Sequence, residues 1–318
     1  MNVTTSATTT DRNAGATAPA IDVLDLTKRY GDTVALDGLS MRVPAGTVFG
    51  FLGPNGAGKT TTVKLLLGLA RPSGGSGSLL GRPLGDRTAR KRIGYLPELF
   101  RYQAWLTARD VLQLHRRLIG DETIDHRAIG EALDTVGLAD RAGSRIGGFS
   151  KGMRQRLGLA VALLGQPSLV ILDEPTSALD PLGRLEVRTV IRALRDRGTT
   201  VFLNSHLLGE VERVCDEVAI VNRGRLIAAG RLDELLGMPT LRIRATGVGP
   251  DGVQRLGAYG EVTTDGPWIS IRGCQPEQVP DLVAAIVAGG GRIYAVEPGR
   301  ETLEERFVEL LGPETAAS

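Results

Sequence analysis

This sequence of 318 residues has little net charge and few cysteines, and each shortage excludes a class of protein. A formal net charge of only +2 argues against a dedicated nucleic-acid binder, because such proteins need excess positive charge to neutralise phosphates. The two cysteines, Cys215 and Cys274, are too few and too far apart for a disulfide scaffold or a metal site, and we expect reduced thiols. The histidines at 115, 126 and 206 show no ligand spacing.

Long hydrophobic runs are also missing. The longest apolar stretches, 157–164 and 168–172, are much shorter than the roughly 18–20 residues that cross a bilayer as a helix. The N-terminal residues are rich in threonine and alanine and lack the basic start and apolar run of a secretory signal. We expect residues 1–18 to be a disordered tail, because they cannot bury enough apolar surface to offset the entropy of ordering. With neither signal nor span, we expect a cytosolic chain that only a partner can hold at a membrane.

The sequence does contain an alternation of strand and helix patterns. Short apolar strands followed by amphipathic helices predict an α/β fold, and a hydrophobic content of 42% supplies its core. The predicted strands are 21–26, 35–43, 47–52, 92–96, 169–172, 200–204 and 217–222, and the predicted helices are 60–69, 184–195 and 207–214. Residues 107–165 have helical periodicity throughout, and Thr107 with Asp110 resembles a helix N-terminal cap.

The composition changes near residues 237–239, where we expect a domain boundary. We predict a large domain over residues 19–236 and a small α+β domain over residues 239–318. In the small domain the predicted order is strand 241–245, helix 252–256, strands 261–263 and 268–272, helix 276–288, strand 292–296 and helix 302–311. The βαββαβ order before the last helix is the ferredoxin-like arrangement.

The strongest chemical signal is the segment from Gly53 to Thr60, which fits the pattern G-x-x-x-x-G-K-[ST]. It lies between a predicted strand and a predicted helix, which is the context that a phosphate-binding loop requires. Glycines let successive backbone N–H groups surround a phosphate, and the helix points its positive end at the same place. Lys59 adds a full charge, and the Thr60 hydroxyl is suited to bind Mg²⁺. The predicted nucleotide-binding residues of this loop are Gly53, Pro54, Asn55, Gly56, Ala57, Gly58, Lys59, Thr60 and Thr61.

The second signal is an apolar strand that ends in two acids, Asp173 and Glu174. Ligands of open α/β sheets bind at the carboxyl ends of the strands. Asp173 is suited to hold Mg²⁺ or its water, and Glu174, one residue later, to polarise an attacking water as a catalytic base. The alternative is a strand that ends in a solvated acidic turn without a catalytic role, and the nearby phosphate loop argues against it.

Three further patterns stand in order around these two motifs. Residues 149–155 read F-S-K-G-M-R-Q before the acidic strand end, and residues 177–180 read S-A-L-D after it. His206 follows a predicted strand, and Tyr30 precedes the second strand. Taken together, these features resemble the ATP-binding cassette (ABC) ATPases over residues 20–235. The resemblance implies a P-loop NTPase core of ABC type with a helical signature subdomain, with ATP as substrate and Mg²⁺ as cofactor.

The resemblance also implies a role for each matching residue. Tyr30 would stack on the adenine base, and His206 would hydrogen-bond the γ-phosphate and the attacking water. Ser150 and Gly152 would contact the γ-phosphate of ATP held by a second subunit, and Asp180 would help to join the two, which implies a head-to-tail dimer. Plainer alternatives remain: a half-buried strand-end tyrosine, a helix N-cap at the serine, and a surface or core histidine.

The sequence departs from the family pattern at three positions. Lys151 adds a charge to the signature, which either strengthens ATP binding or faces solvent, and we favour solvent. Met153 replaces a glutamine of the family and cannot make that residue's hydrogen bonds, which puts contacts to the ribose in doubt. Glu98 stands where the family usually has a glutamine that links Mg²⁺ to the membrane partner. Its carboxylate can still bind a cation, and we expect the link to persist with altered pH or metal dependence.

These features favour the motor subunit of a membrane exporter, which would bind a separate permease at the cytoplasmic face of the membrane. Residues 149–153 and 93–98, together with the ending 301–312, resemble the branch of ABC exporters for drugs, antibiotics and polysaccharides. Phe100, Tyr102 and Trp105 suit a partner surface, although core packing explains them equally well. The alternatives are a soluble ABC ATPase and an ATP-gated regulator that is not coupled to transport. The small domain either lengthens the dimer contact, senses a ligand or only stabilises the chain.

Overall fold

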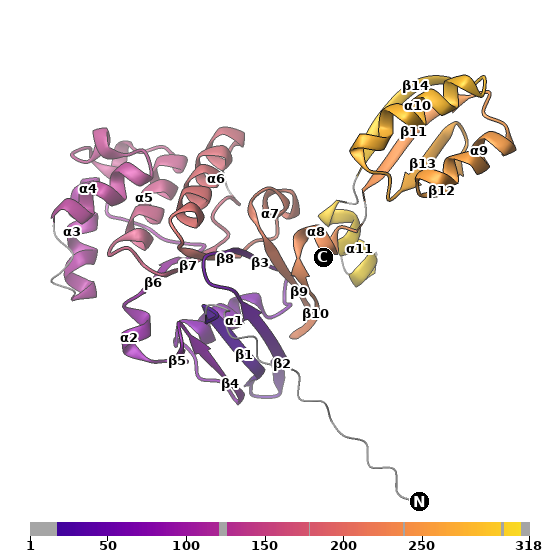
Figure 1. Cartoon of the computed structure of the whole chain (residues 1–318). Helices are drawn as coiled ribbons and strands as arrows, with labels where there is room; N and C mark the ends of the chain where they lie inside the picture. Colours follow the sequence, from indigo (N-terminus) through magenta and orange to yellow (C-terminus); the bar gives the residue numbers. More distant parts are fainter. Residues whose placement is uncertain (1–17, 121–125, 178, 238, 300–301, 313–318) are drawn as a thin grey trace, which may run out of the picture.

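The computed structural model describes residues 18–120, 126–177, 179–237, 239–299 and 302–312 (Figure 1). The described residues form three sheets, two in the N-terminal part of the chain and one near the C-terminus. Most of the tail predicted over residues 1–18 lies outside the described residues. No helix among the described residues is long and apolar enough to cross a membrane.

The central sheet has six strands in the order β10-β9-β3-β8-β7-β6. All neighbours are parallel except the edge strand β10, which pairs antiparallel with β9. The strands are β3 (Val48–Leu52), β6 (Ile93–Leu96), β7 (Leu169–Asp173), β8 (Thr200–Asn204), β9 (Glu217–Asn222) and β10 (Arg225–Arg231). Every residue of β3, β7 and β8 is buried, which explains why the interiors of these strands are continuous apolar runs rather than alternating, with polar residues only at the ends of β7 and β8.

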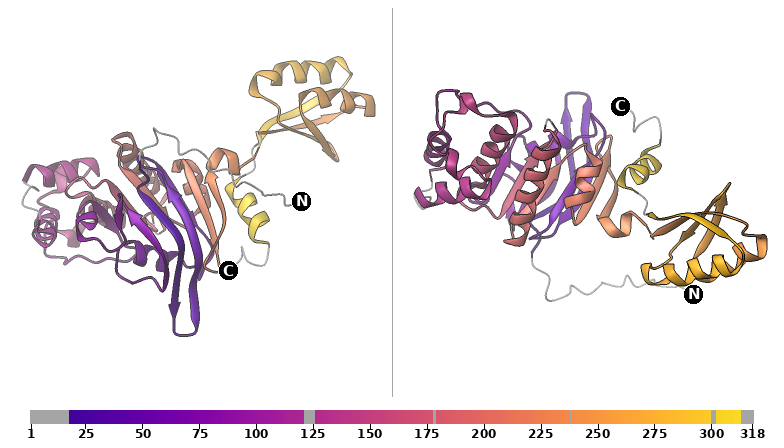
Figure 2. Two further views of the ribbon diagram at one scale, coloured as in Figure 1. Left: turned by 60° about the horizontal axis from the view of Figure 1, so that its bottom comes forward. Right: turned by 90° about the horizontal axis from the view of Figure 1, so that it is seen from above.

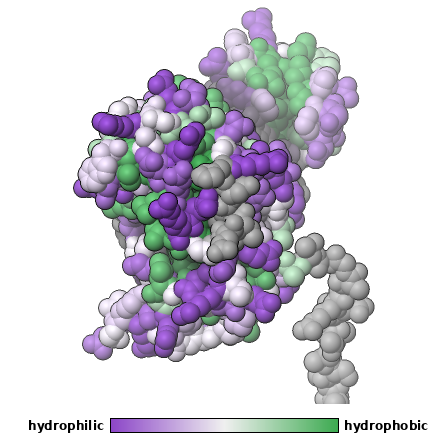
Figure 3. Space-filling view, turned by 90° about the vertical axis from the view of Figure 1, so that its left-hand side faces the viewer, coloured by the Kyte–Doolittle hydropathy of each residue, from purple (hydrophilic) through white to green (hydrophobic). Residues whose placement is uncertain are grey.

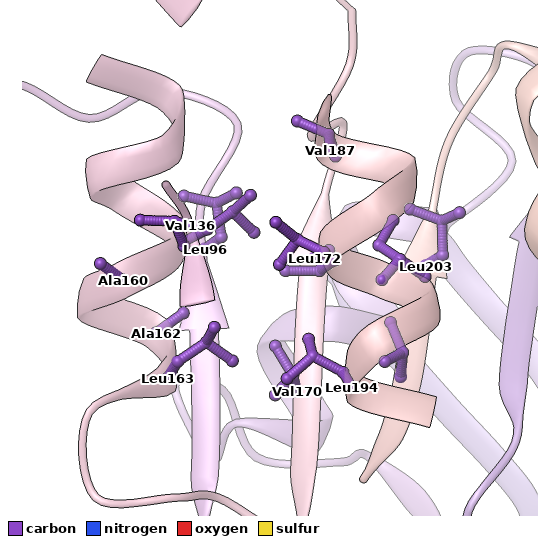
Figure 4. Close-up of a cluster of buried hydrophobic side chains, with 14 of the residues drawn as sticks. Leu96, Val136, Ala160, Ala162, Leu163, Val170, Leu172, Val187, Leu194 and Leu203 are labelled. Atoms are coloured by element: carbon purple, nitrogen blue, oxygen red, sulfur yellow. The ribbon is translucent and has the colours of Figure 1, made fainter. Parts of the chain in front are cut away.

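Helices cover one face of this sheet. Figure 4 shows side chains of β6, β7 and β8 beneath α5 (Lys151–Leu163) and α6 (Pro181–Asp196), with Leu172 of β7 between the two helices. These residues belong to one hydrophobic core, in which Val170, Leu172 and Val187 are fully buried. Helix α7 (Leu208–Val214) packs on the same face beside β3. The carboxyl ends of these strands therefore open onto a single edge, where the predicted site residues lie.

A second sheet and helix α1 (Lys59–Leu66) cover the opposite face. This antiparallel sheet has the order β2-β1-β4-β5, and its core joins α1 to the central sheet through Phe49, Phe51 and Phe202. The strands are β1 (Ile21–Tyr30), β2 (Thr33–Val43), β4 (Gly74–Leu79) and β5 (Arg82–Pro83). A short helix, α2 (Arg87–Arg90), leads to β6.

The helical subdomain contains α3 (Ala108–Ile119), α4 (His126–Thr135) and α5. Thr107 caps α3 as predicted: its hydroxyl accepts the N–H of Asp110, whose carboxylate accepts the N–H of Thr107. The edge strand β10 was not predicted. Its sequence, R-L-I-A-A-G-R, contains alanine and glycine, which are poor strand formers, and only the pairing with β9 gives it a partner.

The third sheet belongs to the small C-terminal domain and has the order β12-β13-β11-β14. Its elements are β11 (Thr240–Thr246), α9 (Pro250–Leu256), β12 (Glu261–Asp265), β13 (Trp268–Arg272), α10 (Val279–Ala288) and β14 (Arg292–Gly299). The order along the chain is βαββαβ and all pairs are antiparallel, as expected for a ferredoxin-like domain. The domain has its own core around Ile243, Ile271 and Leu282.

The last helix, α11 (Leu303–Leu311), lies beside the cassette rather than on the small domain (Figure 2). Leu303 and Phe307 belong to the core of the large domain, not to that of the small one. Between the two parts of the chain, the short helix α8 (Leu232–Leu235) precedes β11. We keep the division of the chain at residues 236–239 as a proposal, with α11 returning to the large domain.

Candidate functional site

The phosphate loop runs from the end of β3 into α1, and its glycines are required by the surrounding backbone. A Cβ atom on Gly53 would lie 2.3 Å from the carbonyl oxygen of Val221, and one on Gly58 would lie 2.6 Å from that of Ala35. Gly58 caps α1 with a φ of 102°, and Gly56 has a φ of 78°, both in the region that favours glycine. No acidic residue lies in the first turn of α1, so its positive end is available to an anion.

Lys59 is the buried cation of this loop. Its side chain is 9% exposed, and its Nζ donates to the carbonyl oxygens of Gly53 at 2.7 Å and Pro54 at 3.1 Å. Burial lowers the pKa of Lys59, while the charges of Glu174, Asp173 and Glu98 oppose that shift. The ammonium group is therefore held inside the loop, where the phosphates of a nucleotide are its natural counter-charge. Thr60, in the next position, is exposed.

Asp173 ends β7 and is 5% exposed. Burial raises its pKa, and the hydrogen bond from Asn204 Nδ2 opposes the rise. Glu98 adds to the rise, and Lys59 opposes it. Asn204 Oδ1 is buried without a hydrogen-bond partner in the described structure. A buried carboxylate beside an unsatisfied amide oxygen is a polar pair that a cation or its water would satisfy.

Glu174 and His206 form a direct pair at the same strand ends. His206 Nδ1 lies 2.8 Å from Glu174 Oε1, and the other carboxylate oxygen lies 3.5 Å from Ser205 Oγ. Glu174 is 9% exposed while the histidine side chain is 53% exposed, so the pair links the interior to the surface. Burial raises the pKa of Glu174, and the hydrogen bond and charge of His206 oppose the rise.

The backbone at Glu174 is strained. Its φ of 51° lies in the left-handed region, which costs a residue other than glycine about 1 kcal/mol or more. Its N–H donates to the carbonyl oxygen of Asn204 at 2.8 Å, which secures this conformation from the neighbouring strand. The turn therefore points the side chain of Glu174 in a different direction from that of Asp173, although the two residues are adjacent in sequence.

Glu98 is an exposed carboxylate that follows β6, and its charge reaches the buried groups of the site. Besides its action on Asp173 and Lys59, it contributes with burial and Asp173 to raise the pKa of Tyr95 to about 12. The sequence prediction that Glu98 lies near the phosphate site is thus consistent with its electrostatic neighbours. The carboxyl ends of three neighbouring strands therefore carry polar groups of the site: Glu98 follows β6, Asp173 ends β7 and Asn204 ends β8.

The residues of this site fit a Mg²⁺ ion that takes only some of its ligands from the protein. Among the described residues no group of three or more His, Cys, Asp or Glu side chains is arranged to hold a metal. Asp173, Glu98 and the Thr60 hydroxyl offer oxygen atoms of the kind that Mg²⁺ prefers, and such an ion would keep waters and phosphate oxygens for its other positions. This donor set matches a metal that arrives with a nucleotide.

Tyr30 ends β1 as a largely exposed ring, at 47% exposure. Lys28 Nζ lies 4.8 Å from the ring centroid, a cation–π contact that orients the ring. Tyr30 pairs with Thr33 in the β1–β2 hairpin, and the Ala35 carbonyl of the same hairpin closely approaches Gly58 of the loop, so an aromatic face here suits base stacking.

Ser150 and Gly152 are not brought to the phosphate loop of their own chain. Ser150 caps α5, where its hydroxyl accepts the N–H of Met153 at 3.2 Å. Lys151 is exposed, as we expected of a lysine that faces solvent. Of the segment 177–180, residue 178 lies outside the described residues, and Asp180 caps α6.

Two residues of the site were missed in the sequence: Asn204, which bonds Asp173, and Ser205, which approaches Glu174. Both stand at the carboxyl end of the predicted strand 200–204, next to β7 in the sheet. Adjacent polar residues at a buried strand end were the signal that could have identified them.

Replacing Glu174 by Gln is expected to raise the melting temperature by a few degrees at neutral pH. Burial raises the folded-state pKa of Glu174, so its stabilising contribution is present at low pH and is lost as pH rises through that pKa. A neutral amide avoids this loss and can still accept a hydrogen bond from His206. Thermal melts of both proteins should converge as pH falls towards about 4, the ordinary carboxyl range. A lower melting temperature for E174Q at neutral pH would contradict this reading.

Comparison with known sequences gives consistent similarities. The family profile described as ABC transporter matches residues 36–177. The chain is 44% identical over 282 residues to an uncharacterized ABC transporter ATP-binding protein of Nostoc sp., covering 87% of this chain and 83% of that protein. It is 43% identical to the bacitracin transport ATP-binding protein BcrA of Bacillus licheniformis, covering 68% and 71%. It is 36% identical to the Nod factor export ATP-binding protein I of Rhizobium etli, covering 93% and 94%.

Solved structures resemble the same part of the fold. An ATP-binding subunit of an ABC transporter superposes with a TM-score of 0.61 at 33% identity, covering 68% of this chain and 91% of that one. An ATP-binding cassette in its ADP conformation gives a TM-score of 0.63 at 21% identity, covering 69% and 93%, and at that identity it shows the fold alone.

Proposed function

The chain belongs to the ABC transporter family as an ATP-binding, ATP-hydrolysing subunit, and from this premise we propose that it powers a membrane exporter through a separate permease. Relatives named for bacitracin transport and Nod factor export support the exporter reading. The single observation that supports hydrolysis most directly is the contact between Glu174 and His206 beside the phosphate loop. A binding module that only senses ATP has no need for a strained, buried carboxylate paired with a histidine.

In this proposal each residue has one task. Lys59 and the loop N–H groups bind the outer phosphates of ATP, and Tyr30 stacks on the base. Glu174 accepts a proton from the attacking water, because its raised pKa keeps the carboxylate close to a useful basicity. His206 orients that carboxylate and the γ-phosphate. A bound Mg²⁺ supplies charge neutralisation of the phosphates, with Asp173, Glu98 and Thr60 as its protein ligands.

The active form in this proposal is a dimer. Within one chain Ser150 caps its own α5, and neither Ser150 nor Gly152 lines the cavity beside the phosphate loop. A second, head-to-tail copy would supply this segment and close over the nucleotide. ATP then holds the two copies together, and loss of the γ-phosphate contacts on hydrolysis lets them separate.

The permease would dock on the helical subdomain. Leu99 and Trp105 are 86% and 70% exposed near it, whereas the Phe100 and Tyr102 rings lie in tilted contact, with centroids 5.4 Å apart, and pack against the core. The aromatic cluster of the sequence thus divides into two core residues and one surface residue. Figure 3 looks onto this side of the molecule, where hydrophobic (green) areas lie between hydrophilic ones. An exposed Trp in such a surface is a typical interface anchor.

Cell fractionation of the native host tests the permease proposal. We expect the tagged full chain in the membrane fraction and Trp105→Glu largely in the cytosol, with ATPase activity retained. Trp268→Glu, the matched change of the other tryptophan on the small domain, should stay with the membrane. A wild-type chain recovered only from the cytosol would instead favour a soluble ABC ATPase.

A further inference from the structure

The last helix, α11, is held on the helix that follows His206. Leu303 is fully buried and Phe307 is 7% exposed, and both pack in the core that contains Val211 and Val214 of α7. The two helices are direct neighbours, and α11 lies away from the small domain that precedes it in the chain (Figures 1 and 2). The chain therefore leaves the cassette, forms the small domain and returns to the cassette at α7.

Helix α7 is short and weakly capped, so it depends on its neighbours. It has seven residues, begins two positions after His206, and has no side-chain hydrogen bond at its N-cap, Leu207. Its inner face packs so closely on β3 that a Cβ on Gly50 would lie 2.8 Å from Val211. On another side, Glu210 pairs with Arg188 of α6 at 3.5 Å. A further side is contacted by α11.

A specific hydrogen bond anchors α11 to α7. Glu212 Oε2 accepts the N–H of Leu303 at 3.0 Å. The first N–H groups of a helix have no partner within the helix, and a carboxylate there also complements the helix dipole. Thr302 and Glu305 satisfy each other in a capping box, and Glu212 of α7 accepts the N–H of Leu303, one of the two N–H groups between them.

The same helix also borders the reaction site. A cavity of about 690 Å³ is lined by Gly53–Asn55 of the phosphate loop, by residues 206–210 and by Phe307 and Val308 of α11. One wall of this cavity is thus the nucleotide-binding loop and another is the C-terminal helix. A displacement of α11 would change both the support of α7 and the surroundings of His206.

We propose that Leu303, Phe307 and Glu212 are positioning residues for hydrolysis. By holding α7, they keep His206 where its Nδ1 meets Glu174. The inference rests on the proposed catalytic role of His206 and is independent of the permease.

The test compares Phe307→Ala with Val308→Ala in the full-length chain. Val308 is 41% exposed, lines the same cavity and is not part of the core, so it is a matched control on the same helix. For F307A we expect kcat to fall about 10-fold or more, since small displacements of catalytic groups have effects of this size, while KM for ATP stays within about twofold. Phe307→Leu should restore most of the rate. Glu212→Gln, which keeps the shape of the side chain, should lower kcat in the same direction.

Two further measurements show whether the effect passes through His206. Hydrogen exchange of the α7 amides should accelerate in F307A and not in V308A. In a His206→Ala background, F307A should cause little further loss of kcat, because the two changes remove the same contribution. Additive losses, a rise of KM that matches the fall of kcat, or unchanged kcat in a folded F307A protein would each overturn the proposal. If wild-type hydrolysis proved independent of Glu174 and His206, the proposed mechanism would fail first, while the exchange data would still report on the docking of α11.

Discussion

Glu174→Gln should abolish nearly all ATP hydrolysis while leaving nucleotide binding intact. The carboxylate is the only buried acid within reach of His206, at 2.8 Å, among the described residues, and an amide cannot take the proton of the attacking water. General-base catalysis contributes about 10²- to 10⁴-fold, so we expect kcat to fall by about 1,000-fold. KM or Kd for Mg·ATP should change little, because the glutamine keeps the shape of the site. Phosphate release by the purified chain, measured alongside ATP binding, checks both parts.

Glu217→Gln is the matched control for this variant. Burial raises the pKa of Glu217 as well, but this residue stands at the amino end of β9, on the edge of the sheet opposite the site. Its variant should hydrolyse ATP at the wild-type rate. Equal rates of ATP hydrolysis for wild type and E174Q would refute the assignment of Glu174 as the base. The higher stability expected of E174Q would then come without a loss of activity.

Lys59→Ala should weaken binding of Mg·ATP by about 100-fold. Lys59 is buried and held by two loop carbonyls, and the phosphates would replace that partnership with charge-assisted hydrogen bonds. Removing such a bond at a charged group costs up to about 3 kcal/mol, which corresponds to about 100-fold in Kd. Calorimetry or displacement of a fluorescent nucleotide measures the change directly.

Lys64→Ala supplies the control, because Lys64 lies on the same helix but is exposed to solvent. We expect its Kd to remain within about twofold of wild type, as is usual for a surface change without specific contacts. A K59A protein that binds Mg·ATP as tightly as wild type would refute the assignment of the loop. Near-equal weakening in both variants would indicate a general charge effect rather than a phosphate contact.

Local sequence was sufficient for most of the secondary structure and for the phosphate loop. Strands β8 and β9 were predicted with the bounds that the structure gives, because buried parallel strands are continuous apolar runs with clear polar ends. The loop needs only adjacent residues: glycines that tolerate close backbone approach, followed by a helix start. The same reasoning failed at β10, whose strand character comes from pairing with β9 and not from its own residues.

The contacts of the site depend on residues that are far apart in the chain. Nothing in the sequence around Asp173 indicates that Asn204 would bond it, since this contact follows from the adjacency of β7 and β8 in the sheet. The division of the aromatic residues 100–105 into core and surface was likewise undecided until the helical subdomain was in place. An amphipathic pattern predicts that a side chain is buried, but it does not predict which helix or strand the side chain packs against.

Residue types and spacing alone determined that this chain binds a triphosphate, because a phosphate loop is made of consecutive backbone groups whose geometry local sequence controls. Tertiary structure alone decided that Glu174 sits in a strained turn against His206, and that the final helix returns to support α7 instead of completing the small domain. Those arrangements arise when strands and helices that are distant in the chain bury their apolar faces together. The hydrogen-bond and ion-pair partners of each polar group are therefore determined only when the whole core has formed.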